Sequence, residues 1–181
     1  MGSSAASGSL DRSARPLIGL RRKPGRLVLV VFRLPLVLYQ RGWGGLLGGT
    51  FLLLVHAGRK TGNLHQVVAM VLRYNPETGE AVICSAWGQD ADWVRNIRAR
   101  PAVRVQIGRD SFTPKQRFLS EDESVAVLAE FRRRHPGRSR LLSAILGWGD
   151  LCSDTAARDF VSTRPFISLR PADPAAPDNC A

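Results

Sequence analysis

The sequence is poor in cysteine, histidine, tyrosine and lysine, and these scarcities exclude several classes of protein. Three of its 181 residues are cysteine, an odd number without a Cys-x-x-Cys spacing, so we expect no disulfide framework. The three histidines have no metal-ligand spacing with these cysteines, so we expect no metal site. Lysine supplies only three of the 26 basic residues, so arginine carries almost all of the positive charge.

A long hydrophobic run is also missing. The most apolar stretch, Leu27–Tyr39, contains Arg33 and is interrupted by Pro35. It is shorter than the roughly 20 apolar residues that a membrane-spanning helix needs. With no signal peptide evident, we expect a cytoplasmic protein in a reducing compartment. The stretch predicts either a helix packed on the domain or an interfacial helix at the inner face of the cell membrane.

The positive charge is concentrated in the N-terminal third of the chain. Residues 1–60 carry ten basic residues and one acid, whereas residues 61–181 carry 16 basic and 14 acidic residues. The net charge of +11 therefore divides into +9 and +2. Such a field attracts anions such as a membrane surface or a phosphorylated ligand. The basic run 132–134 lacks interleaved aromatic residues, so nucleic acid is not an expected partner.

Length and composition predict one domain with loose ends. Hydrophobic residues make up 44% of the chain and charged residues 23%, values typical of a globular protein. We expect a flexible basic N-terminal arm over 1–23, a single domain over 24–170 and a loose C-terminal tail over 171–181. The domain is expected to begin with a helix that runs to about residue 41 and is kinked by Pro35.

The rest of the domain predicts five or six short strands and few helices. The strands are expected at 51–56, 65–74, 80–85, 102–107, 111–119 and 164–169. Helices are expected at 93–100, capped by Asp90 or Asp92, at 121–135, opened by a capping box of Ser120 and Glu123, and at 139–146. This α+β pattern, mainly β with helices, favours a small antiparallel barrel whose helices cap its ends and sides.

The first candidate site is a turn between two strands, with the sequence Gly58-Arg59-Lys60-Thr61-Gly62. Two cations, a hydroxyl and backbone N–H groups freed by glycine are suited to holding phosphate or carboxylate. The turn is not a Walker A loop, because Arg59 separates Gly58 from Lys60. The alternative is a solvated hairpin tip.

The second candidate site follows a predicted strand and precedes a predicted helix, with the sequence Ser85-Ala86-Trp87-Gly88. Small residues at such a place let a planar ligand lie close to the backbone, and the Trp87 indole would cover it. The alternative is an ordinary loop between a strand and a helix.

The third candidate site is one face of the short helix that follows. Trp93 and Asn96 stand three residues apart and therefore share that face. Trp93 would form a pocket wall, and Asn96 would donate and accept hydrogen bonds. The alternative is a core tryptophan with a capping asparagine. No catalytic triad or carboxylate pair is assembled, so the catalytic residues are unknown and redox chemistry would need a cofactor.

Taken in order, these motifs resemble the deazaflavin-dependent nitroreductase family, split β-barrel proteins that bind coenzyme F-420. The likeness covers about residues 38–120 and rests on five segments: Gly48-Gly49-Thr50-Phe51, the turn 58–62, the loop 85–88, the segment 92–101 and the strand 103–108. It implies a small antiparallel split β-barrel of the FMN-binding, flavin-reductase-like type.

The resemblance also implies an activity. The protein would transfer a hydride from reduced coenzyme F-420 to a quinone, a nitroaromatic or a related acceptor. Site roles carry over to three groups of residues: a tail-binding turn of Arg59, Lys60, Thr61 and Gly62, a ring-binding loop of Ser85, Ala86, Trp87 and Gly88, and a pocket closure of Trp93 and Asn96. A homodimer is a further implication, for which Val103, Val105 and Ile107 would offer an exposed face.

Two departures from the family pattern keep an alternative open. Leu64-His65 follows the basic turn where the family often has Pro-Arg, and Ala86 stands where the family often has a cation. The alternative is a non-catalytic split-barrel module that binds a flavin such as FMN, a haem or a fatty acyl ligand, at a membrane surface. Nitroreduction is not specifically indicated, because the family's nitro-reducing members carry tyrosines near the acceptor and this chain has two tyrosines in all.

Overall fold

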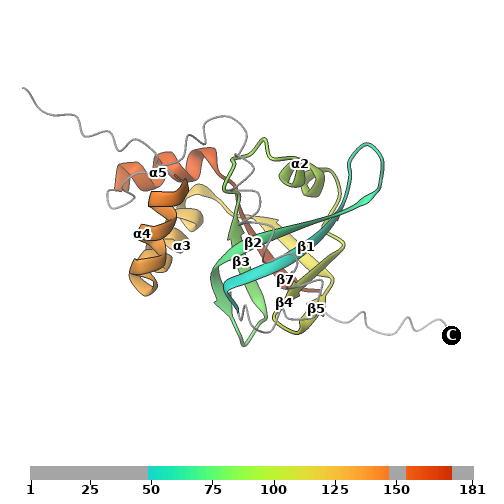
Figure 1. Cartoon of the computed structure of the whole chain (residues 1–181), viewed down its shortest axis with the longest axis horizontal. Helices are drawn as coiled ribbons and strands as arrows, with labels where there is room; N and C mark the ends of the chain where they lie inside the picture. The colour runs from blue at the N-terminus through green and yellow to red at the C-terminus, as the bar shows by residue number, and fades with distance from the viewer. Residues whose placement is uncertain (1–48, 147–153, 173–181) are drawn as a thin grey trace, which may run out of the picture.

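Seven antiparallel strands form one continuous sheet that curls into a barrel (Figure 1). The computed structural model describes residues 49–146 and 154–172. The strands are β1 (Phe51–Ala57), β2 (Leu64–Asn75), β3 (Glu80–Cys84), β4 (Arg104–Ile107), β5 (Asp110–Phe112), β6 (Pro114–Phe118) and β7 (Phe166–Pro171). Their hydrogen-bonded order is β5-β4-β1-β2-β3-β7-β6. The prediction of a mainly β, split-barrel fold with capping helices is confirmed.

The chain itself brings the two edges of this sheet together. Strands β5 and β6 lie at opposite ends of the order, yet only Thr113 separates them in sequence. One residue spans only about 3.5 Å, so a flat sheet of this order is impossible and the sheet must curl. The Ala172 amide donates to the Thr113 carbonyl at 2.9 Å, which ties the end of the β6–β7 pair to this corner.

Two hydrophobic cores lie on the two faces of the curled sheet. Inside the barrel, Leu52, Leu54, Ile83 and Ile167 are almost fully buried. On the outer face, Leu72, Val82 and Phe166 pack against helices α3 (Glu121–Arg134) and α5 (Asp154–Thr163). Because successive strand residues point to opposite faces, neighbours such as Phe166 and Ile167 serve different cores. The short strands β3 and β7 therefore have apolar residues on both faces.

The helices occupy two separate places around the barrel. Figure 1 shows α3, α4 (Pro136–Leu146) and α5 gathered at one side. The short helix α2 (Asp92–Ala99) lies apart from them, beside the long hairpin that β1 and β2 form (Figure 1). Helix α2 buries Val94 and Ile97 in the barrel core, and this contact fixes its position against the hairpin.

Several details of the structure correct the expectations. The described residues form seven strands rather than five or six, because the expected strand at 111–119 breaks at the barrel corner into β5 and β6. Helix α5 was not expected, although its Ala157, Phe160 and Val161 form an apolar face. The N-cap residue of α2 is Ala91, and neither Asp90 nor Asp92 caps the helix with its side chain. The capping box of α3 is confirmed.

The expected exposed face for a homodimer is also corrected. Val105 and Ile107 point into the barrel and are 0% and 4% exposed, whereas Val103, which precedes β4, is 44% exposed. Alternation along β4 puts its apolar residues inside, so the strand offers no continuous apolar surface. The N-terminal arm, the expected helix before residue 41 and the tail beyond 172 lie outside the described residues. Among those described, no helix has the length and apolarity to cross a membrane.

Candidate functional site

A pocket of about 490 Å³ lies between the free end of the β1–β2 hairpin and helix α2. Three segments line it: the end of β1 with the turn that follows, the start of β2, and the first half of α2. The lining residues are His56, Gly58, Arg59, Lys60, Thr61, His65, Gln66, Val67, Asp92, Trp93 and Asn96. A volume of this size is usual for small-molecule sites. The first and third candidate sites of the sequence therefore meet in one cavity.

Glycine shapes the turn of residues 58–62, which we call the basic turn. Gly62 has a φ of +75°, in the left-handed region that favours glycine. Its amide donates to the Gly58 carbonyl at 2.8 Å, and the Gly58 amide donates to the Asn63 carbonyl at 2.8 Å. Within the described residues, the amides of Lys60 and Thr61 have no such acceptor. The basic turn therefore offers two backbone donors and two cationic side chains to a ligand.

The buried side chain of Asn96 joins the basic turn to α2. Its Oδ1 accepts from the Arg59 backbone amide at 3.1 Å and from Arg59 Nη1 at 3.0 Å. The same guanidinium nitrogen contacts Asp92 Oδ1 at 3.0 Å. Asn96 is 6% exposed, so its two bonds with Arg59 are partly shielded from water, whereas the contact with Asp92 is exposed. Helix α2 therefore holds Arg59 by both its backbone and its side chain.

The second half of the Asn96 amide reaches His56. Both Arg59 groups are obligate donors, so Oδ1 must face them and Nδ2 must face the imidazole. Nδ2 lies 3.3 Å from His56 Nδ1, which accepts this hydrogen bond only when it carries no proton. Burial and then the charge of His65 lower the pKa of His56, against a hydrogen bond with the Ala57 backbone that raises it. His56 is therefore a neutral member of the network.

Trp93 is at once a core residue and a wall of the pocket. Its side chain is 9% exposed and belongs to the cluster inside the barrel. It also lines the cavity beside Asn96 and Val67. Trp93 therefore lies both in the core and at the pocket, and its contact with a ligand stays a prediction.

Sequence reasoning missed five lining residues, which are His56, His65, Gln66, Val67 and Asp92. His56 and His65 are register partners across β1 and β2, and their ring centroids lie 5.7 Å apart. His56 lies two residues before the basic turn and His65 three residues after it, so the expected hairpin would have placed these two histidines close together. Asp92 was considered only as a helix cap, but in the structure it binds Arg59.

The second candidate site, residues 85–88, does not line this pocket. Ser85 is fully buried, and its hydroxyl donates to the Gly88 carbonyl at 2.7 Å. Gly88 has a φ of +81°, and a Cβ added there would lie 3.2 Å from the Thr163 carbonyl oxygen. The loop thus packs against the end of α5, and Trp87 is 40% exposed. Contact of this loop, including Ala86, with a coenzyme ring stays a prediction.

Comparison of the sequence with protein families assigns the chain. The family described as F420H(2)-dependent quinone reductase matches residues 36–140, a segment that contains every residue of the pocket. The chain belongs to this family. It is therefore an F-420-dependent reductase, and its cofactor is the deazaflavin coenzyme F-420. Among curated proteins, none matches the sequence.

Solved structures resemble this reductase at low sequence identity. One, titled "Structure of F420-H2 Dependent Reductase (FDR-A)", is 19% identical, with 66% of this chain and 93% of that chain covered and a TM-score of 0.45. An FMN-binding protein from Nostoc punctiforme, related to pyridoxamine 5'-phosphate oxidase, is 12% identical, with 83% and 82% covered and a TM-score of 0.40. A protein of unknown function from Agrobacterium tumefaciens is 14% identical, with 88% and 60% covered and a TM-score of 0.46. The family assignment rests on the sequence match alone.

Proposed function

We propose that this reductase binds coenzyme F-420 in the pocket between the basic turn and α2, and passes its hydride to a quinone. One observation carries the proposal. Asn96 fixes Arg59 to the helix that also supplies Trp93, so a cationic cradle and an aromatic wall belong to one rigid unit. Such a unit suits a ligand that has an anionic part and a planar part.

The residues present fit the coenzyme. Its tail carries phosphate, and the basic turn supplies the Lys60 ammonium, the Arg59 guanidinium and the amides of Lys60 and Thr61. Glycine at 58 keeps this backbone open, because a Cβ there would lie 3.0 Å from Thr61 Oγ1 and 3.1 Å from His65 Nε2. The planar ring would lie toward Trp93. The loop at 85–88 is not part of the pocket lining, so it would contact the ring from outside this lining.

When bound, the reduced coenzyme supplies the hydride, and the protein supplies position. Asn96 and Asp92 hold the Arg59 guanidinium in one orientation, which costs less entropy on binding than ordering a free side chain. The buried indole of Trp93 keeps water from one wall. Holding donor and acceptor in contact contributes much of the acceleration in such reactions.

A quinone is the acceptor that we propose, and a nitroaromatic compound is the second candidate. The family description supports a quinone. Among the described residues, no tyrosine lines the pocket. We therefore expect faster oxidation of the reduced coenzyme by a menaquinone analogue than by a nitroaromatic compound. Equal or reversed rates would contradict this choice of acceptor.

Replacing the two cations of the basic turn tests the proposed site. The R59A/K60A double variant should bind coenzyme F-420 at least about tenfold more weakly, since a hydrogen bond to a charged group contributes about 1.5 to 3 kcal/mol. A calorimetric titration measures this, with FMN in parallel as a comparator that we expect to bind more weakly. Unchanged affinity in the double variant would place the coenzyme elsewhere.

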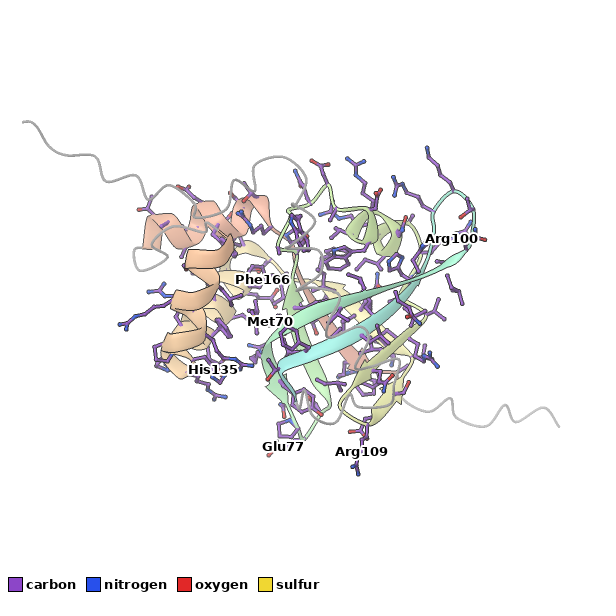
Figure 2. The ribbon with its side chains drawn as sticks, in the orientation of Figure 1. Met70, Glu77, Arg100, Arg109, His135 and Phe166 are labelled. Carbon is purple, nitrogen blue, oxygen red and sulfur yellow. The ribbon has the colours of Figure 1, made fainter. Side chains whose placement is uncertain are left out.

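The matched control is Arg109→Ala. Figure 2 shows Arg109 at the bottom of the barrel, away from Arg100 beside the β1–β2 hairpin. The control removes a cation from the same protein without touching the pocket, so its affinity should equal that of the wild type. Association with a membrane surface and with a second copy of the chain remain proposals, which cosedimentation with anionic vesicles and analytical ultracentrifugation would test.

A further inference from the structure

His65 lies at the cationic end of the pocket and has no role in the proposed function so far. It stands on β2, opposite His56 in the register, and lines the cavity. Its Nε2 lies 3.1 Å from the position that a Cβ on Gly58 would take, so the imidazole edge packs against the basic turn. The side chain is exposed and makes no hydrogen bond with the described residues. Its ring nitrogens are therefore available to a ligand.

The groups that face His65 come from three elements. His56 on β1 is buried and neutral, as its hydrogen bond with Asn96 requires. The basic turn contributes Arg59 and Lys60, and α2 contributes Asp92.

The only carboxylate among these lining residues is Asp92, and it is already held by Arg59 at 3.0 Å. At the C-cap of α2, the Arg100 Nη1 atom lies 3.7 Å from where a Gly62 Cβ would be, which adds another positive charge near the turn. The pocket without a ligand thus surrounds His65 with more positive than negative charge.

We infer that His65 is a titratable contact for the anionic group of the coenzyme, so that the pocket binds this anion more tightly when His65 is protonated. The inference rests on the proposed function, because it needs the coenzyme's anionic group at the basic turn. A bound anion attracts a protonated His65 and so offsets the repulsion from Arg59 and Lys60. Imidazolium donates from both nitrogens, whereas neutral imidazole donates from one.

The direction of the pH dependence follows from linkage. An anion at the basic turn interacts more favourably with a protonated imidazole than with a neutral one, so anion binding and protonation favour each other. The affinity for the anion therefore rises as the pH falls and the imidazole takes up a proton.

Two variants at the same position test this inference by calorimetric titration with coenzyme F-420. His65→Gln keeps a polar side chain without a titratable proton, and His65→Arg supplies a fixed positive charge. Measurements at about pH 5.5 and about pH 8 bracket the ordinary histidine pKa. The wild type should bind about tenfold more tightly than His65→Gln at the lower pH and equally at the higher pH. His65→Arg should bind more tightly than His65→Gln at both.

Each variant reports a separate failure. The coenzyme's own ionisation affects all three proteins equally, so only the ratios between them count. A wild-type pH profile that matches that of His65→Gln would overturn the inference while leaving the proposed function intact. Failure of all three proteins to bind the coenzyme at either pH would overturn the proposed function, and this inference with it. Thermal melting of each variant in the absence of coenzyme confirms that the fold is intact.

Discussion

Asn96 is the residue on which the geometry of the pocket depends. It satisfies the Arg59 amide, orients the Arg59 guanidinium and donates to His56, all from a side chain that is 6% exposed. No shorter or apolar side chain reproduces both an acceptor and a donor at this place. Asn96 therefore couples the stability of the hairpin end to the shape of the binding site.

Replacement of Asn96 by alanine should cost both stability and affinity. The part-buried Arg59 amide and the buried His56 ring would lose their partners, which typically costs about 1 to 3 kcal/mol in the free energy of unfolding. Coenzyme affinity should fall as well, because Arg59 would lose its fixed orientation. Urea denaturation and calorimetric titration measure the two effects.

Asn75→Ala is the matched control for this variant. Asn75 Oδ1 accepts from the Glu77 amide at 2.9 Å, in an exposed turn at the opposite end of β2. We expect a loss of less than about 1 kcal/mol and unchanged coenzyme affinity. Equal losses of stability in the two variants would show that the Asn96 network contributes no more than an ordinary surface turn.

His56 should make the protein less stable as the pH falls below neutral. Burial lowers its pKa in the folded state below the ordinary 6.5, so the unfolded chain binds the proton more readily. The contribution of neutral His56 to the free energy of unfolding is therefore fully present above about pH 6.5 and is lost as the pH falls through the folded-state pKa. Urea denaturation at about pH 7.5 and about pH 5.5 measures how much stability the wild type and His56→Asn each lose as the pH falls. A wild-type loss no larger than that of His56→Asn would contradict this role.

At the scale of elements, helix α3 is fixed at its start by local chemistry. The Ser120 hydroxyl accepts from the Glu123 amide, and the Glu123 carboxylate accepts from the Ser120 amide at 2.8 Å. Hydrogen bonds from Arg117 and then from the Ser120 backbone lower the pKa of Glu123 to about 2. The helix start is thus tied to β6 as well as capped.

Ser120→Ala should destabilise the protein by about 1 kcal/mol, the usual loss for an N-cap serine. The Glu123 amide would lose its partner and form a hydrogen bond with water instead, so the loss of stability should be modest. Ser162→Ala provides the comparison, since the exposed Ser162 hydroxyl donates to the Asp159 carbonyl within the same helix, α5. We expect a near-zero change there in urea denaturation. A larger loss at Ser162 than at Ser120 would contradict the assignment of the cap.

Prediction of elements from sequence succeeded where the signal was local. The strands near 51–56 and 65–74, the turn between them and the capping box at Ser120 all follow from neighbouring residues. It failed at Thr113, where the break between β5 and β6 depends on where the barrel edges meet. Helix α5 was missed because its apolar face is short and becomes recognisable only from its packing against α3 and β7.

At the scale of the molecule, the pocket lies where elements distant in the sequence meet. Its lining draws on β1, β2 and α2, and α2 keeps its place through the barrel core. The coenzyme should therefore stabilise the whole fold. At a coenzyme concentration about 100 times Kd, the gain is about 2.7 kcal/mol for a ligand that binds only the folded state. Differential scanning fluorimetry should show a higher Tm with coenzyme for the wild type and a much smaller rise for R59A/K60A. An equal rise of Tm in both proteins would show that the stabilisation by the coenzyme does not depend on the cations of the basic turn.

The sequence by itself determined the hairpin of β1 and β2, the glycine-bounded basic turn and the pairing of Trp93 with Asn96 on one helical face. These features depend on residues close together in the chain, whose spacing sets their geometry directly. Only the tertiary structure decided that Asn96 binds Arg59, that His56 and His65 enter the same pocket, and that the loop at 85–88 lies outside its lining. These outcomes depend on how α2 docks on the barrel, which packing of distant apolar side chains sets and which no local pattern records.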